Sequence, residues 1–255
     1  MLFEILAAGA TAAAAPQNKF GFMEALEAGG AISYVTVGIL GIMSFGSFFI
    51  FFTKWWDQSK VIKQSQAIKT GFWKSPTLRE NANRLEKDSA WRQIVDDALE
   101  AEEQHSKLTD ALEAHDWLHG TLNRTENVIN SRLAAGLPFL ATVGATAPFI
   151  GLFGTVVGIY RALIAIGIAG SASIDKVAGP VGEALIMTAL GLLVAVPAVL
   201  AYNFLQARNK RIAEGLTAFS NAVLANINSK GAIRPVQSAA QKPAAKPAPA
   251  AAPKA

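Results

Sequence analysis

Long stretches without a charged side chain dominate the pattern of hydrophobic and polar positions along this chain. Three of them, residues 28–53, 133–160 and 184–207, are long enough to cross a lipid bilayer. A spanning helix needs about 20 apolar residues, because an α-helix rises about 1.5 Å per residue and the hydrocarbon layer is about 30 Å thick. The pattern therefore predicts an all-α membrane protein with three transmembrane helices, and not a soluble domain with three buried helices.

Amphipathic helices are predicted between the first two spans. Residues 75–104 place their apolar positions close to the 3.6-residue period of a helix, and Ser75 followed by Pro76 is typical of a helix start. A second stripe, over residues 107–133, runs into the second span with Gly120 as the only breaker. We expect this stripe and the second span to form one long helix. The third span also continues as a helix, which we expect Gly231 and Pro235 to end.

These patterns divide the chain into eight segments. They are an N-terminal segment at 1–30, transmembrane helix 1 at 31–53, an internal helical region at 54–131, transmembrane helix 2 at 132–161, a short outer loop at 162–176, transmembrane helix 3 at 177–207, an internal helix extension at 208–230, and a disordered Pro/Ala/Lys tail at 231–255. Residues 1–15 are predicted to be either a signal peptide or a short surface helix. The run is apolar and ends in small residues, but Glu4 stands where a signal peptide is positively charged.

The positive charges indicate how the spans are oriented. Five lysines lie within residues 54–74, after the first span, Arg132 precedes the second, and Arg208, Lys210 and Arg211 follow the third. Positive residues near span ends remain in the cytoplasm, so the N-terminus is expected outside and the C-terminus inside. Trp55 and Trp56 at the inner end of the first span are typical of an aromatic belt.

Composition narrows the chemistry further. Only 16% of the residues are charged and there is no cysteine, which excludes disulfides and thiol chemistry. The net charge of +4 is explained by membrane topology and not by nucleic-acid binding. His115 and His119 have a spacing that can hold a metal, but no third ligand accompanies them in a recognised pattern, and a solvated helix face is preferred. We expect no catalytic residues, no metal and no cofactor, and therefore no enzyme.

Small residues follow one face of the second span. This face contains Gly144, Gly151, Gly154 and Gly158. The third span also contains several small residues, among them Gly191. Small residues let helix backbones approach closely inside a membrane, so we expect these glycines to pack helices together. Thr155 lies about 20° from Gly144 around the helix and so belongs to the packed side. Its hydroxyl, like that of Thr188, either bonds back to its own helix or forms part of a polar track.

Glu183 is the residue that packing alone does not explain. It lies near the outer start of the third span, with no basic residue beside it in the sequence. An acid inside a membrane costs a few kcal/mol on insertion scales unless it faces protein or water, and burial raises the pKa of a carboxyl group. Glu183 is therefore predicted to exchange protons; the alternative is an acid that reaches the lipid headgroups.

Two blocks of sequence strongly resemble the second and third spans of the MotA/TolQ/ExbB proton-channel family, most closely its ExbB branch. They are LATVGATAPFIGLFGTVVGIYRAL, residues 140–163, and VAGPVGEALIMTALGLLVAVPAVLAYN, residues 177–203. The resemblance places the family's conserved glutamate on Glu183 and its two polar threonines on Thr155 and Thr188.

The resemblance also implies an assembly and a task. It implies a homopentamer around a central pore. In each chain, two of the three transmembrane helices would be long and extend into the cytoplasm. An ExbD-like dimer would fill the pore, and inward proton flow across the bacterial inner membrane would energise a TonB-like protein for uptake of iron complexes and vitamin B12. The N-terminus and the 162–176 loop would then be periplasmic. The alternatives are a TolQ-type subunit of the Tol-Pal system, a flagellar stator subunit, a small-solute transporter, and a purely structural membrane scaffold.

Overall fold

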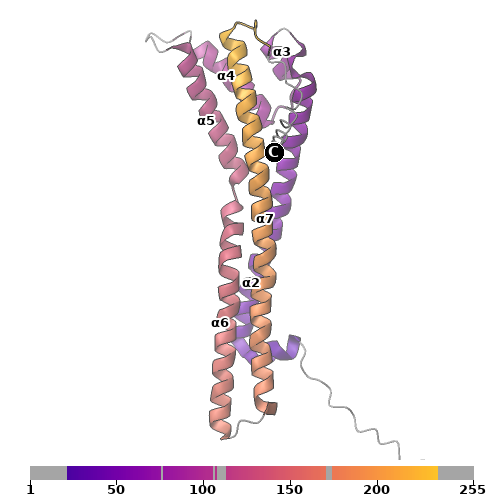
Figure 1. The fold of residues 1–255 in the computed structure, drawn as a ribbon, viewed down its shortest axis with the longest axis vertical. Coiled ribbons are helices and arrows are strands. Elements are labelled where there is room, and N and C mark those ends of the chain that lie inside the picture. Colours follow the sequence, from indigo (N-terminus) through magenta and orange to yellow (C-terminus); the bar gives the residue numbers. More distant parts are fainter. Residues whose placement is uncertain (1–21, 76, 106, 108–112, 171–173, 235–255) are drawn as a thin grey trace, which may run out of the picture. The chain divides into compact units, whose positions relative to one another are not determined.

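Helices make up almost all of the chain that the structure describes. The computed structural model describes residues 22–75, 77–105, 107, 113–170 and 174–234. In chain order the elements are α2 (Phe22–Gly71), the short 3-10 helix η1 (Phe72–Lys74), α3 (Leu78–Asn83), α4 (Ala90–His105), α5 (Ala114–Ala134), α6 (Leu137–Ala169) and α7 (Ile174–Asn228) (Figure 1).

Three helical stretches of the described chain are long and apolar enough to cross a membrane. They are Gly30–Gln66, Ala114–Ile168 and Ala184–Asn228. Only 17%, 24% and 28% of their most apolar windows is buried inside the single chain. Apolar side chains on the outside of such helices suit lipid or other membrane helices as neighbours. The prediction of an all-α protein with three helices of membrane-spanning length is confirmed.

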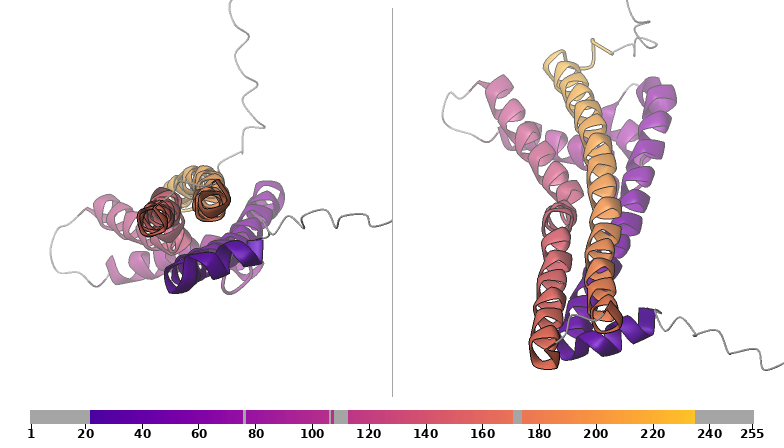
Figure 2. Two further views of the ribbon diagram at one scale, coloured as in Figure 1. Left: turned by 90° about the horizontal axis from the view of Figure 1, so that it is seen from below. Right: turned by 60° about the horizontal axis from the view of Figure 1, so that its bottom comes forward.

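The contacts divide the chain into two compact units. The first unit comprises residues 1–56 and 134–208, and the second comprises residues 57–133 and 209–255. In the first unit, α6 and the first part of α7 lie side by side along α2 (Figures 1 and 2). Small and branched side chains form its core: Leu40, Val143, Ala147, Ala195 and Ala198 in one cluster, and Leu137, Leu140 and Leu205 in another.

A single glycine redirects α2 near its start. Gly30 has φ 59° and ψ −153°, a backbone conformation that side chains with a Cβ rarely adopt. The helical residues before Gly30 turn away from the long part of α2 (Figure 2). The predicted choice between signal peptide and surface helix concerns residues 1–15, which lie outside the described residues.

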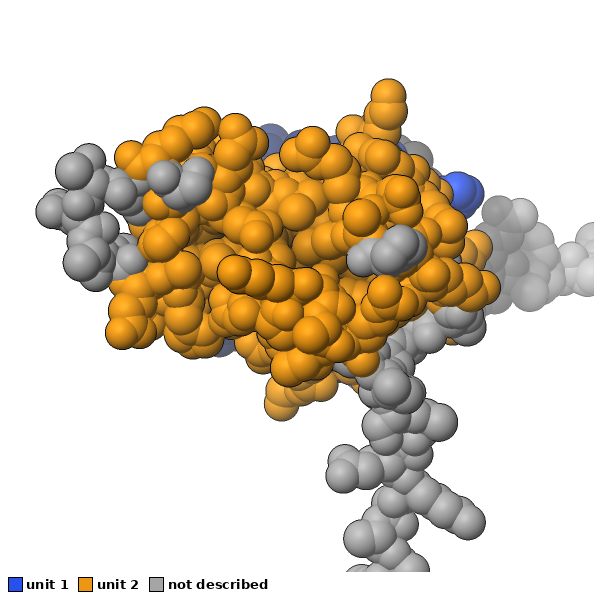
Figure 3. All heavy atoms as spheres, turned by 90° about the horizontal axis from the view of Figure 1, so that it is seen from above, with its two compact units in different colours: residues 1–56, 134–208 blue, residues 57–133, 209–255 orange. Residues whose placement is uncertain are grey.

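The second unit, orange in Figure 3, has its own aromatic core. Trp91 of α4 is 3% exposed, and its indole N–H donates to the carbonyl oxygen of Val61 at 3.0 Å. The ring of Phe219 in α7 meets Trp91 edge to face at 5.5 Å and Phe72 at 5.0 Å. Aliphatic side chains of α4, α5 and α7 complete the cluster, including Ile94, Val95, Leu118, Leu122, Leu216 and Val223.

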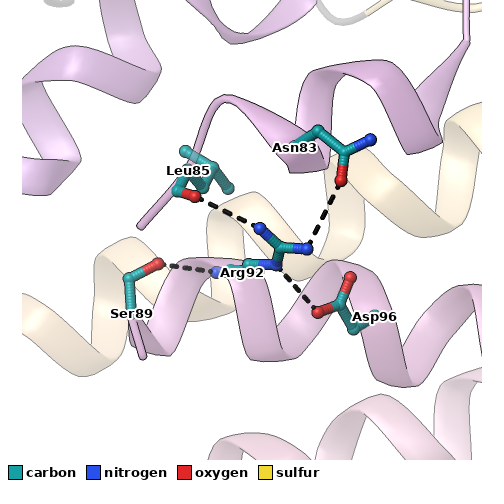
Figure 4. Close-up of polar contacts among 5 residues, drawn as sticks. All are labelled: Asn83, Leu85, Ser89, Arg92 and Asp96. Atoms are coloured by element: carbon teal, nitrogen blue, oxygen red, sulfur yellow. Dashed lines mark hydrogen bonds and ion pairs between the residues drawn. The ribbon is translucent and has the colours of Figure 1, made fainter. Parts of the chain in front are cut away.

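A turn interrupts the helical pattern predicted over residues 75–104. Helix α3 ends at Asn83 and α4 begins at Ala90. The hydroxyl of Ser89 accepts the backbone N–H of Arg92 at 3.1 Å, the capping contact that starts a helix. The guanidinium of Arg92 donates to Asp96 at 3.1 Å and to the Leu85 carbonyl at 3.4 Å, which ties the turn to α4 (Figure 4).

The long helix predicted from residue 107 through the second span is not continuous. The structure ends α5 at Ala134 and starts α6 at Leu137, with Gly136 between them at φ 88°. A glycine in the left-handed region ends a helix, and Pro138 fits the first turn of the next one. Gly120, the breaker that the pattern suggested, lies inside α5.

Most of the loop predicted at residues 162–176 is helical. Helix α6 continues to Ala169, and α7 begins at Ile174. Gly170 has φ 62° and donates its N–H to the Ile166 carbonyl at 3.1 Å. At the other end, α7 stops at Asn228 and Gly231 has φ 82°. Residues 235–255 of the predicted disordered tail lie outside the described residues.

Candidate functional site

Thr155 and Thr188, predicted from separate helices, meet in the first unit. Thr155 of α6 and Thr188 of α7 are both partly buried, and their hydroxyl oxygens lie 2.5 Å apart. The Thr155 hydroxyl also lies 2.9 Å from the carbonyl oxygen of Ala184 in α7 and 3.2 Å from that of Gly151 in its own helix. Thr155 thus bonds back to its own helix and also contacts α7 across the helix pair.

This arrangement gives both hydroxyls a hydrogen-bond partner. A threonine hydroxyl has one hydrogen to donate and two lone pairs to accept with. Thr155 can donate to the Ala184 carbonyl while it accepts from Thr188, so both hydroxyls are satisfied in an apolar setting. Reversing the contact makes Thr155 the donor and Thr188 the acceptor. The contact is therefore compatible with either hydroxyl as the donor.

Glycines bring the two helices close enough for this contact. A Cβ added at Gly151 would lie 2.6 Å from the Met187 carbonyl oxygen, and one at Gly191 would lie 2.7 Å from that of Ala147. At Gly144 the added atom would lie 2.3 Å from a methyl carbon of Val199. Each of these distances is too short for a real Cβ. These three glycines therefore pack α6 directly against α7 within one chain.

Gly154 and Gly158 lie on the same face of α6. A Cβ at Gly154 would lie 3.1 Å from Met187 and 3.4 Å from a methyl carbon of Thr36 in α2. Gly154 thus faces the junction of all three membrane-length helices of the first unit. Gly158 is buried.

Sequence reasoning missed two residues of this junction. Met187 is 0% exposed and lies one residue before Thr188. Thr36 is 2% exposed, and its hydroxyl donates to the Ile32 carbonyl at 2.9 Å. The signal for Thr36 was its spacing: Ser33, Thr36, Leu40 and Ser47 share one face of the first span, and all four are buried.

Glu183 belongs to α7, immediately before Ala184. Its backbone is helical, and its side chain lies outside the described residues. The carbonyl that accepts from Thr155 therefore belongs to the residue that follows the predicted proton-handling acid. The titration of Glu183 stays a prediction.

His115 and His119 lie on an exposed face of α5. The rings of His115 and His119 stack with centroids 6.2 Å apart, and His115 Nδ1 lies 2.9 Å from the Asn228 side-chain nitrogen. Within the described residues, no group of three or more metal-ligating side chains comes together.

Comparison with known proteins shows where the chain belongs. The model of the MotA/TolQ/ExbB proton channel family matches residues 86–217, just over half of the chain. A biopolymer transport protein ExbB of Xanthomonas campestris pv. campestris (strain B100) is 38% identical over 201 residues, which cover 75% of this chain and 79% of the relative.

Two further relatives match shorter parts of the chain. An ExbB of Neisseria gonorrhoeae is 52% identical over 116 residues, 46% of this chain and 53% of the relative. A Tol-Pal system protein TolQ of Pseudomonas aeruginosa is 43% identical over 99 residues, 39% of this chain and 43% of the relative. The family match includes α6, most of α7 and the threonine contact between them. On these grounds the chain belongs to the MotA/TolQ/ExbB proton channel family.

Proposed function

We propose that this chain is the proton-channel subunit of an inner-membrane motor of the ExbB–ExbD type, with Thr155, Thr188 and Glu183 on its proton pathway. The contact between the Thr155 and Thr188 hydroxyls carries the proposal. A pair of exchangeable hydroxyls between apolar helices is a poor choice for packing alone, because valine would fill the same space without a polar group to satisfy.

The threonines supply a neutral link in the pathway. A hydroxyl could accept a proton at its oxygen from water or a partner's carboxyl group and release its own hydrogen to a second such acceptor, so charge would move without a permanent ion in the membrane. A permanent charge at this depth would cost several kcal/mol. The Ala184 carbonyl holds the Thr155 hydroxyl in place for this exchange.

Glu183 supplies the titratable group. Glu183 and Thr188 are five residues apart in α7, about 7.5 Å along an ideal helix axis and on different sides of it. They are too far apart for direct transfer in that geometry, so water or a partner's carboxyl group would bridge them. This chain would therefore need a second subunit with an acid in the membrane, which is the role of the ExbD-like partner.

The exposed apolar faces of α6 and α7 support assembly with other subunits. Phe149 and Tyr160 of α6 and Leu193 of α7 are 70%, 64% and 68% exposed in the single chain. We infer that several copies, a pentamer in this family, enclose the partner's helices with such faces. The long second part of α7 would then extend into the cytoplasm, and the N-terminus would lie in the periplasm.

The task of the motor would be to energise a TonB-like protein for uptake of iron complexes and vitamin B12. The length of the match to the Xanthomonas ExbB, 201 residues, supports this task over that of TolQ. The TolQ match covers 99 residues around the shared spans. The mechanism would be the same in both systems.

The decisive experiment substitutes Glu183 and measures growth on chelated iron. It also tests whether the wild-type chain rescues a strain that lacks ExbB or one that lacks TolQ. Glu183→Gln keeps the shape of the side chain but cannot titrate, so the variant should assemble with its partner and yet fail to support growth on chelated iron. Glu183→Asp should retain part of the activity if the position is tolerant. The wild-type chain should rescue a strain that lacks ExbB, and not one that lacks TolQ.

Three outcomes would contradict the proposal. Full growth and full proton conductance of Glu183→Gln at equal membrane abundance would make the acid structural. Rescue of outer-membrane integrity in the TolQ-deficient strain, without iron uptake, would assign the chain to the Tol-Pal system. If membranes with the wild-type chain and its partner conduct no protons, the chain would be a purely structural membrane scaffold.

A further inference from the structure

A groove of about 470 Å³ lies between α4 and α5 of the second unit. Asp97 and Glu100 of α4 and Asp116 of α5 line it. Trp117 lines it as well, and its indole N–H donates to the Ala101 carbonyl at 3.0 Å, which fixes the ring at the wall. The groove therefore combines negative charge with an aromatic surface.

The negative charge of this region is only partly compensated within the described residues. Helix α4 has five acidic residues, of which Asp96 pairs with Arg92 and Glu103 pairs with Lys107, and neither pair lines the groove. In the groove, Asp97 accepts a hydrogen bond from the Thr125 hydroxyl at 2.6 Å, and Glu100 accepts one from the Gln104 amide at 2.9 Å. These donors are neutral, so they orient the carboxylates and leave their charge in place. Arg124 is the basic residue among the lining side chains.

The last 21 residues of the chain have the complementary chemistry. Residues 235–255 contain three lysines, five prolines and no acidic residue. Proline-rich segments favour the extended polyproline helix and dock on grooves lined by aromatic side chains. Lysines between the prolines would meet the carboxylates of the groove, and the prolines would meet Trp117.

This segment also begins beside the groove. The Asn228 side-chain nitrogen at the end of α7 lies 2.9 Å from Nδ1 of His115, the neighbour of Asp116. The Asn226 amide donates to the Ile233 carbonyl at 2.7 Å and holds the last described residues at the same end of α7. From Pro235 an extended chain can span up to about 25 Å to Lys242, so Lys242 can reach the carboxylates at this end of the groove.

We propose that residues 235–255 dock in the α4–α5 groove of the same chain, with Lys242 and Lys246 against its carboxylates. The contact would be electrostatic and partly exposed, so salt weakens it. It depends only on the second unit and the C-terminal segment, and it stands independently of the proton pathway.

Disulfide trapping in the full-length protein tests this docking. The natural chain has no cysteine, so pairs can be introduced without background. Gln104→Cys places a thiol at the groove, Ala245→Cys places one between the two lysines, and neither substitution changes a charge. The control pair joins Ala245→Cys with Asn127→Cys, an exposed position of α5 that lines a different depression.

The groove pair should form an intrachain disulfide at least about tenfold faster than the control pair, because docking raises the effective concentration. The rate should fall towards the control in about 0.5 M salt and in a variant with Lys242, Lys246 and Lys254 changed to glutamine. It should also fall in Glu100→Gln with Asp116→Asn, while the thermal unfolding of α4 and α5 remains unchanged. Mass spectrometry of the digested protein identifies the linked peptides.

Several results would overturn the proposal. Equal rates for the two pairs would mean that the tail does not dock. Disulfide-linked dimers in place of intrachain links would assign the tail to a neighbouring copy. Trapping in phosphatidylcholine nanodiscs that disappears in phosphatidylglycerol nanodiscs would assign it to the membrane surface.

Discussion

At the residue scale, the molecule places hydroxyls where an apolar side chain would pack equally well. Thr155 reaches the carbonyl oxygens of both helices, and its third neighbour is the Thr188 hydroxyl. A bond back to the same helix satisfies a buried threonine without any partner. The second contact across the helices is the feature that distinguishes this pair from Thr142, which bonds back to the Pro138 carbonyl at 2.9 Å and is exposed.

We predict that Thr155→Val and Thr188→Val impair proton transfer more than folding. Each change keeps the shape and deletes one hydroxyl, so proton conductance and TonB-dependent uptake should fall by at least about tenfold. The stability lost with one hydrogen bond is only about 1 kcal/mol. Conductance is measured in proteoliposomes that contain the partner subunit.

Serine and an exposed threonine provide the controls for this prediction. Thr155→Ser and Thr188→Ser keep the hydroxyl and should retain most of the uptake, and Thr142→Val should behave as wild type. Normal uptake in both buried valine variants would mean that the hydroxyls only satisfy their own helices.

At the element scale, glycine contacts determine how closely α6 and α7 approach. The Cα atoms of Gly151 and Gly191 face each other so closely that a Cβ on either residue would lie 3.0–3.1 Å from the other Cα. The sequence pattern predicted that such glycines pack helices together, without showing which helices. The structure uses them inside one chain, so a larger side chain would separate α6 from α7 and with them the two threonines.

We predict opposite effects for alanine at two glycines. Gly191→Ala pushes its new methyl group into the Ala147 carbonyl and should cost about 1–3 kcal/mol of stability. Gly167→Ala, where the added Cβ meets nothing within 4 Å, should be neutral or stabilising by up to about 1 kcal/mol, because alanine favours helix. Thermal unfolding in detergent measures both. Equal melting temperatures for the two variants would contradict the close contact.

Two tryptophans provide a similar comparison: Trp91 in the core of the second unit and Trp56 at an exposed position of the first unit. Trp91→Ala should destabilise the protein by about 3–5 kcal/mol, because it removes the ring that packs on Phe219 and bonds to Val61. Trp56→Ala is the matched control, since Trp56 is 70% exposed. Chemical denaturation followed by circular dichroism gives both values, and a small effect of Trp91→Ala would show that the aromatic core is dispensable.

At the scale of the whole molecule, orientation in the membrane is the central expectation. The positive residues after the first and third spans predict a periplasmic N-terminus and a cytoplasmic second unit. The second unit has its own aromatic core, and charged side chains such as Glu86, Lys87 and Asp88 are exposed on its surface, which suits a position in water.

Single cysteines in this cysteine-free chain test the orientation. Phe20→Cys and Ser171→Cys should react with a membrane-impermeant thiol reagent in intact spheroplasts, whereas Glu102→Cys should react only after the membrane is opened. Glu102 is exposed, so its protection would come from the membrane and not from burial. Labelling of Glu102→Cys in sealed cells would reverse the proposed topology.

Much of the site could be anticipated because membrane helices show their packed faces in the sequence. The period of the helix places Gly144, Gly151 and Thr155 on one side of α6. Small residues in the sequence of α7 likewise indicate that it packs closely against another helix. Periodicity cannot show which helix lies opposite, so the roles of Thr36 and Met187 remained hidden. It also missed the break at Gly136, because the apolar stripe continues on both sides of it.

The sequence by itself determined the class of the protein, since uncharged runs of more than 20 residues have few alternatives to a membrane. Only the tertiary structure decided which groups touch. Thr155 and Thr188 are 33 positions apart, and their contact depends on the register in which α6 packs on α7. That register is determined by backbone contacts at Gly151 and Gly191, where the absence of a side chain lets the helices approach. The fit depends on the surfaces of α6 and α7 together, so the residue pattern of either helix alone does not predict it.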